Sequence, residues 1–167
     1  KSKKIIKYKN AWLKLYDVPI VYFPKFSHPD PTVKRQSGFL TPGFSNSSNI
    51  CLSLDIPYYK VISDNKDLTF TPRLYFNDQL ILQTEYRQAN KANNHVVDFS
   101  VNNSDYASGI NNTKSHFFSN SNIDLKMNNF NSSKLEFNVE TTTNDTYLKT
   151  YKINSPLIKD TTTLNSY

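Results

Sequence analysis

The sequence predicts an all-β fold of antiparallel strands. Three observations indicate it: apolar and polar residues alternate with a period of two in most segments, clusters of Asn, Asp and Ser separate these segments, and no segment has a helical apolar stripe. The 167 residues suffice for one sizeable domain or two small ones, and 11 Tyr and 11 Phe supply apolar area that disordered chains lack. With three Gly, the chain is not collagen-like.

The first unit is expected over residues 1–30. Its apolar residues suggest two short strands that end in extended chain interrupted by Pro19 and Pro24. The segment from Ser27 to Pro31 contains two further prolines, and each fixes its own φ and holds the preceding residue extended. We therefore expect residues 31–37 to be a linker and residues 38–167 to be a second unit.

Seven strands are expected after residue 37. Alternation is clearest in five segments: 50–56, 68–76, 97–101, 123–127 and 135–139. Turn-forming residues cluster between the strands, at 45–49, 63–66, 77–78, 89–94, 102–113 and 128–133. The second, fourth and sixth connections are expected to be short and the odd ones generally longer. Such a meander is typical of outer-membrane barrels.

A soluble sandwich or jelly roll has the same alternation, because one face of each of its sheets is a core. Two details favour a barrel. Consecutive hairpins follow one another without an obvious crossover, and the polar faces are dense in charge. The charged residues in question are Arg73, Glu85, Arg87, Asp98, Asp124 and Glu136. This density suits a wet lumen.

Charge and cysteine content limit the classes of function. The formal net charge is +6, partly from lysines at the N-terminus, but no basic stripe with interleaved aromatics is evident, so nucleic-acid binding is not expected. No apolar run reaches the length of a membrane helix. The one cysteine, Cys51, cannot form an internal disulfide, and no Cys or His cluster has metal-ligand spacing, so neither a metal nor another cofactor is expected.

Catalysis is not expected either. His28, His95 and His116 are far apart in sequence and lack a recognisable nucleophile, so each is interpreted as a solvated histidine in a loop or at a strand end. Glu136 and Glu140 share a strand face, but in a wet lumen neither would acquire the raised pKa of a general acid.

Five motifs carry a resemblance to a known family. They are Val18-Pro-Ile-Val-Tyr-Phe-Pro24, Lys34-Arg-Gln-Ser-Gly-Phe-Leu-Thr-Pro42, Leu54-Asp-Ile-Pro-Tyr-Tyr59, Asp67-Leu-Thr-Phe-Thr-Pro-Arg73 and Glu85-Tyr-Arg87. In order and spacing, over roughly residues 11 to 90, they resemble the LptD family, also called OstA or Imp, of lipopolysaccharide-assembly proteins of the outer membrane. A looser resemblance continues in the segments 137–140 and 144–148.

The resemblance implies an architecture and partners. Residues 1–30 would be the C-terminal end of a periplasmic β-jelly-roll, and residues 38–167 the first strands of a large outer-membrane β-barrel, so that the chain is an internal fragment. The implied partners are lipopolysaccharide, an LptE-like lipoprotein plug, an LptA-like periplasmic bridge protein and the barrel-assembly machinery. Two other readings stay open: a different outer-membrane barrel, such as a porin or receptor, or a soluble carbohydrate-binding β-sandwich.

Prolines mark the expected site. Proline cannot donate to a β-ladder, so Pro42 in the first barrel strand and Pro57 in the second weaken a sheet edge or shape a bulge. By resemblance they belong, with Gly38 and Phe39, to a lateral gate through which the lipid leaves the barrel. A turn centred on Ser47 and Ser48 would place Pro42 opposite about Ser53, and Pro57 opposite about Gly38.

Three further residues are considered, two for a lipid path in the first unit and one in the third strand of the second unit. Val21 and Phe23 are expected to line a path for acyl chains in the jelly-roll, although alternation alone does not distinguish them from Ile20 and Tyr22. Pro72, one strand further from the seam, is the weakest gate candidate and is left outside the expected gate.

Overall fold

The computed structural model describes residues 5–30, 32, 35–47, 50–76, 79–104, 112–127, 130 and 132–158. They form two antiparallel sheets and one short helix, which confirms the all-β prediction. Lys1, Lys3, Lys4 and the expected turn at Asn77 and Asp78 lie outside the described residues. Among the helices searched in this part of the chain, none is long and apolar enough to cross a membrane.

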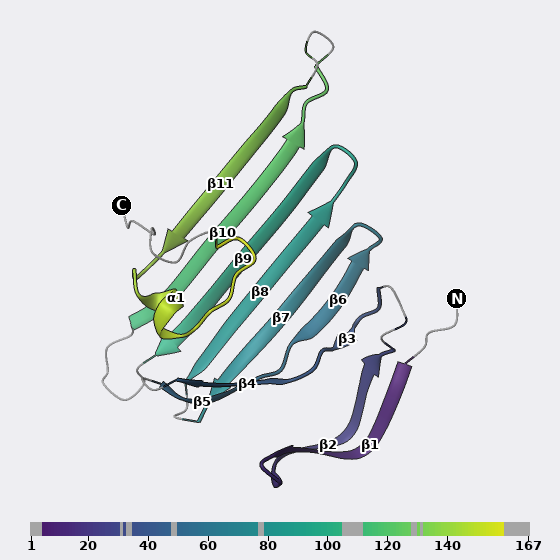
Figure 1. The fold of residues 1–167 in the computed structure, drawn as a ribbon, viewed down its shortest axis with the longest axis vertical. Coiled ribbons are helices and arrows are strands. Elements are labelled where there is room, and N and C mark those ends of the chain that lie inside the picture. The colour runs from purple at the N-terminus through teal and green to yellow at the C-terminus, as the bar shows by residue number, and fades with distance from the viewer. Residues whose placement is uncertain are drawn as a thin grey trace.

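The first sheet is a hairpin of β1 (Ile5–Leu15) and β2 (Val18–Pro29). Its turn places Tyr16 and Asp17 at positive φ, and its register shifts between Leu13 and Lys14. Figure 1 shows this hairpin below and beside the larger sheet. The hairpin covers the segment expected as the first unit; its identity as the end of a jelly-roll stays a prediction.

The second sheet has nine strands. Each of the two strands of its first hairpin is interrupted once, so this hairpin accounts for four of the nine. The strands are β3 (Gly38–Phe39), β4 (Gly43–Ser47), β5 (Ile50–Asp55), β6 (Tyr58–Ser63), β7 (Lys66–Tyr75), β8 (Leu80–Ala89), β9 (Asn93–Ser104), β10 (Asn112–Asp124) and β11 (Lys134–Thr142). Taken as broken strands, β3 with β4 and β5 with β6 make up the first two of the seven expected. From β7 to β11 each strand pairs with the next along the chain (Figure 1).

The two faces of this sheet differ in chemistry, as the alternation predicts. The register places all six of the charged residues named above on one face, which we call the polar face. The other, apolar face carries large side chains that are at least a third exposed: Phe70, Leu74, Leu80, Phe99, Phe117, Leu135 and Phe137. An exposed apolar surface of this extent indicates contact with lipid or with another protein.

The expected lengths of the connections were wrong at one place. The connections 64–65 and 90–92 are short, but β10 already ends at Asp124, so the sixth connection, 125–133, is the longest of the even-numbered ones. Lys126 has a positive φ of 46°, and the backbone N–H of Leu125 bonds to the carbonyl of Ser133, so the chain leaves β10 here in a turn. The apolar residues Leu125 and Met127 therefore lie beyond the strand.

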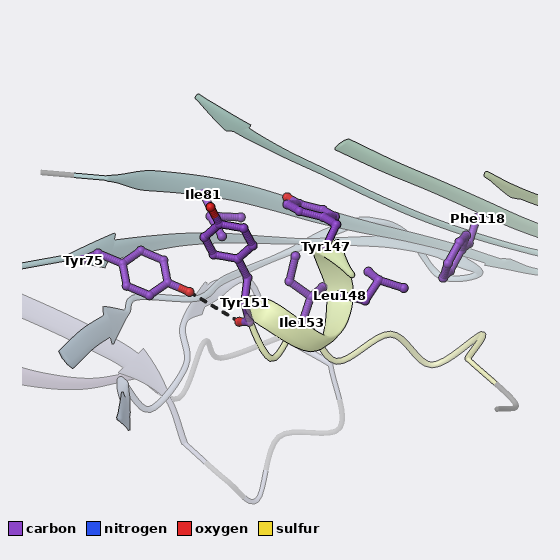
Figure 2. Close-up of a cluster of buried hydrophobic side chains, with 7 residues drawn as sticks. All are labelled: Tyr75, Ile81, Phe118, Tyr147, Leu148, Tyr151 and Ile153. Atoms are coloured by element: carbon purple, nitrogen blue, oxygen red, sulfur yellow. Dashed lines mark hydrogen bonds between the residues drawn. The ribbon is translucent and has the colours of Figure 1, made fainter. Parts of the chain in front are cut away.

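After β11 the chain folds back over the polar face. We call residues 143–158 the strap; it contains the one-turn helix α1 (Tyr147–Thr150). Figure 2 shows four strap side chains packed on three from the sheet. The seven buried residues of this cluster are Tyr147, Leu148, Tyr151 and Ile153 from the strap and Tyr75, Ile81 and Phe118 from the sheet. The main apolar core of the described residues therefore lies on the polar face, beneath the strap.

Candidate functional site

The first hairpin of the large sheet is broken in both strands at the same level. Leu40, Thr41 and Pro42 separate β3 from β4, and Ile56 and Pro57 separate β5 from β6. Below the break Phe39 pairs with Tyr58, and above it Gly43 pairs with Asp55. Three residues thus face two, as in a β-bulge.

The register differs from the predicted one. Ser47 pairs with Ile50, Ser45 pairs with Ser53, and the register shifts between these two pairs, so the partners lie two or three residues later than expected. Pro42 therefore lies beside Ile56 and not opposite Ser53, and Pro57 lies beside Leu40 and not opposite Gly38. The two prolines are concentrated at one level of the hairpin, whereas the predicted register spread them along it.

Pro72 extends this row to a third strand. Asp55 pairs with Arg73 and Tyr58 pairs with Phe70, which places Pro72 beside Ile56. The N–H of Ile56 donates to the carbonyl of Pro72 at 3.1 Å, and the N–H of Leu40 donates to the carbonyl of Pro57 at 2.8 Å. A hydrogen-bonded antiparallel pair exchanges two bonds, and neither proline can return one.

Two adjacent ladders consequently lack a donor at the same level. Each lost bond is worth about 0.5–1.5 kcal/mol net, and more where water is absent. Sequence reasoning left Pro72 out because it lies in the third strand. The sequence did contain a signal for Pro72. Pro42, Pro57 and Pro72 are spaced 15 residues apart, and this equal spacing places the three prolines at the same level of neighbouring strands when each hairpin is about 15 residues long.

Aromatic rings connect this hairpin to the N-terminal sheet. Phe39 of β3 lies edge-on to Tyr58, with ring centroids 5.1 Å apart, and 5.7 Å from Phe26 of β2. Phe26 in turn lies 5.4 Å from Phe23. Both Val21 and Phe23 are half-buried, whereas Tyr22 between them is exposed. The structure thus links Phe23 through Phe26 to Phe39, while Val21 lies further along the same strand.

An ion-pair cluster joins the linker to the large sheet. Asp67 at the start of β7 accepts bonds from Arg35 at 2.6 Å and from Arg87 at 2.8 Å, and its side chain is 11% exposed. Arg35 also donates to the backbone carbonyl of Asp64. The hydrogen bond to Tyr59 and the nearby Asp67 carboxylate raise the pKa of Arg35. The cluster fixes the linker beside the turn between β6 and β7.

The polar face holds the strap mainly through backbone carbonyls. Arg73 donates to the carbonyls of Tyr151 at 2.7 Å and Lys152 at 3.3 Å, and Gln83 donates to that of Asn154 at 2.8 Å. The hydroxyl of Tyr75 donates to the Tyr151 carbonyl at 3.3 Å (Figure 2). Arg73 and Asp98, expected in a wet lumen, are therefore buried beneath the strap, at 8% and 0% exposure.

A chain of buried polar groups lies under α1. Ser100 Oγ is 2.6 Å from His116 Nδ1 and 2.9 Å from the Tyr147 hydroxyl, and His116 Nε2 is 3.2 Å from Asp98 Oδ2. The prediction that His116 is a solvated histidine was wrong: it lies inside β10 and is 1% exposed, because the strap covers it. Burial raises the pKa of Tyr147 to about 12, so this hydroxyl stays protonated at neutral pH.

Serine, histidine and aspartate in this order resemble a hydrolase triad. Here Ser100 is fully buried and its hydroxyl already contacts Tyr147, so the arrangement acts as an anchor for the strap. Among the described residues, no group of three His, Cys, Asp or Glu could hold a metal ion. Sequence reasoning did not find this anchor, because its members come from β9, β10 and the strap.

No family model matches the chain. The chain is 40% identical over 96 residues to the LPS-assembly protein LptD of Pseudoalteromonas translucida, a match that covers 58% of this chain and 13% of the relative. It is 41% identical over 78 residues to LptD of Shewanella oneidensis, covering 47% and 10%, and 34% identical over 83 residues to LptD of Francisella tularensis, covering 50% and 9%.

These matches span about a tenth of the length of each relative. They agree with the resemblance carried by the five motifs. Over about half of its length, the chain is therefore similar to LPS-assembly proteins named LptD.

Proposed function

We propose that this chain is part of a lipopolysaccharide translocon in the outer membrane. In this proposal residues 1–30 are the end of a periplasmic jelly-roll, residues 31–37 a linker, and residues 38–167 the first part of a membrane β-barrel. The relatives are named as LPS-assembly proteins, which supports lipopolysaccharide as the transported molecule.

Strand geometry supports the barrel. The strands β7 to β11 have 10, 10, 12, 13 and 9 residues, and a strand needs about 9–11 residues to cross a bilayer. Phe70, Phe99 and Phe117 lie in one row across the strands on the apolar face. In a membrane, acyl chains would cover this row. In a soluble sandwich the apolar face would meet a second sheet, whereas here the strap covers the opposite, polar face.

The row of prolines is the observation that carries the function. The first strand, β3 with β4, is at an edge of the described sheet, and the missing donors lie in the ladders next to that edge. We propose that Pro42 and Pro57, with Gly38 and Phe39, form the lateral gate of the seam. The weakened ladders allow the seam to open for a lipid without unfolding the rest of the sheet.

The aromatic contacts support a route toward this gate. Phe23 and Phe26 of the hairpin and Phe39 at the gate are in sequential contact. We propose that Val21 and Phe23 line the path by which acyl chains reach the seam. An LptE-like plug, an LptA-like bridge protein and the barrel-assembly machinery are the proposed partners, and the transport step requires no catalysis or cofactor from this chain.

A transport assay tests the gate. Cells whose full-length protein carries Pro42→Val with Pro57→Val should deliver pulse-labelled lipopolysaccharide to the surface more slowly, at an unchanged level of folded protein. Pro19→Val is the matched control, because Pro19 is an exposed strand proline at the far end of the N-terminal hairpin. Unchanged delivery in the double variant would contradict the gate.

A further inference from the structure

The guanidinium of Arg73 contacts two parts of the molecule that are far apart in sequence. Nε donates to Asp55 Oδ1 at 2.7 Å and one terminal nitrogen donates to Asp55 Oδ2 at 2.9 Å. The other terminal nitrogen donates to the carbonyls of Tyr151 and Lys152. All three nitrogens are thus in use, and the side chain is 9% exposed.

The contact of Arg73 with Asp55 lies directly above the row formed by Pro42, Pro57 and Pro72, which we call the proline row. Asp55 is the last residue of β5, and Ile56 and Pro57 follow it. The upper half of the hairpin, β4 with β5, is joined to β7 by the pairs of Ser53, Leu54 and Asp55 and by the bond from the N–H of Phe76 to the carbonyl of Leu52. Because the ladder is weakened just below, the fork between Arg73 and Asp55 is a principal restraint on this half.

The strap end of the junction lies over the polar face. Tyr151 belongs to the buried cluster, so its carbonyl position is fixed only while the strap is docked. Since Arg73 binds backbone carbonyls, the contact depends on strap position and not on the side chain at residue 152. Displacing the strap removes one set of Arg73 partners and frees the guanidinium to move away from Asp55.

We propose that Arg73 is a positioning residue that couples the docking of the strap to the closure of the first hairpin. This inference rests on the proposed function: the strap occupies the polar face, where a sugar chain would pass, and the hairpin borders the seam where lipid would leave. A glycan that lifts the strap loosens the β4–β5 half of the gate, and an open gate weakens strap docking. Such coupling is reciprocal by thermodynamic linkage.

Hydrogen exchange of the full-length protein in detergent, read by mass spectrometry, tests this coupling. Asp55→Asn should raise exchange in the strap, residues 143–158, about tenfold, within the usual range of coupling between sites. Tyr147→Phe, which removes a strap anchor and does not touch the hairpin, should raise exchange in residues 43–55 by a similar factor. In an Arg73→Lys background, which keeps the charge but loses the fork, neither substitution should have a remote effect.

Ser53→Ala is the matched control. Ser53 is buried in the same strand and its hydroxyl donates to the Ser45 carbonyl, with no contact to Arg73, so its loss should raise exchange in the hairpin alone. Heat-modifiable migration of each variant verifies that the barrel is folded. The proposal would be overturned if Asp55→Asn did not change exchange in the strap and Tyr147→Phe did not change exchange in the hairpin. It would also be overturned if these remote changes persisted in the Arg73→Lys background. The readout involves no lipid, so it is independent of whether the protein transports lipopolysaccharide.

Discussion

Leu40 donates its backbone N–H to the carbonyl of Pro57 at 2.8 Å, and Pro57 has no N–H to donate in return. Ile56 and Pro72 repeat this one-sided pairing at the same level of the next ladder. The sheet therefore contains a line of weakness across its first three strands. Below this line the strands are joined to the N-terminal hairpin through Phe39, and above it they are joined to the strap through Arg73.

Restoring a donor at Pro57 should strengthen the hairpin. Pro57→Val supplies the N–H that the carbonyl of Leu40 lacks, a gain of about 0.5–1.5 kcal/mol, or roughly 2- to 12-fold slower exchange of the amides of β3 and β6. Hydrogen exchange of the full-length protein measures this effect, with Pro19→Val as the control that leaves these amides unchanged. Equal exchange in wild type and Pro57→Val would show that the missing bond does not limit opening.

A positive charge should destabilise the protein when it is placed on the apolar face of β10 and should be tolerated on the polar face. Phe117→Arg places the charge on the apolar face, where arginine near the bilayer midplane costs about 2–4 kcal/mol. Asn120→Arg places the same charge on the polar face and should be tolerated. The amount of folded, heat-modifiable protein in outer-membrane fractions measures the difference. Equal loss in both variants, or in neither, would contradict a lipid-facing apolar surface.

The linker should be released when Asp67 loses its charge. Asp67→Asn removes the negative charge shared by Arg35 and Arg87, so trypsin should cleave after Arg35 faster in this variant than in the wild type. Asp64→Asn is the control, because Arg35 contacts only the backbone carbonyl of Asp64. Cleavage at the same rate in both variants would show that Asp67 does not hold the linker.

Strap docking should be lost at high pH. Burial raises the pKa of Tyr147 to about 12, from about 10 when exposed, so the neutral form is favoured in the docked state. This contribution is complete below about pH 10 and disappears as the pH rises from about 10 to about 12. A nitroxide attached at the exposed position 156 should become mobile in this range.

The same label distinguishes the role of Tyr147. In Tyr147→Phe the bond to Ser100 is lost, worth about 1 kcal/mol or roughly fivefold in the docking equilibrium, so the label should be more mobile at neutral pH. The mobility step between about pH 10 and 12 should be smaller in this variant. A mobility step of the same size in Tyr147→Phe and in the wild type would show that a group other than Tyr147 causes it.

The alternation in 68–76 and 135–139 predicted the strands β7 and β11 and the face that each residue occupies. The turn clusters at 63–66 and 89–94 predicted where two of the hairpins bend, because Asn, Asp and Ser form turns by local hydrogen bonds. The predicted register of the first hairpin was wrong, because the pairing of Ser47 with Ile50 and the irregularity between Ser45 and Ser47 change every pair, and side-chain alternation does not fix the register to that accuracy.

The strap could not be predicted from periodicity. Tyr147, Tyr151 and Ile153 follow neither a strand nor a long helix, and they are buried only because the chain folds back onto Ile81 and Phe118. The burial of His116 and Arg73 depends on the same long-range contact. The beginning of β10, with the sequence Asn-Thr-Lys-Ser, likewise lacks an apolar alternation and is ordered as a strand by its partners in β9.

Site-specific photocrosslinking in the full-length protein in cells tests the central claim most directly. Photoreactive residues at positions 42, 57 and 23 should form adducts that an antibody against lipopolysaccharide detects, whereas a probe at Ser132, exposed in the connection before β11, should form none. This pattern would support a path from the hairpin around Phe23 to the proline row. The absence of adducts at all three positions, with the protein correctly inserted, would contradict the translocon and leave a barrel of a different function.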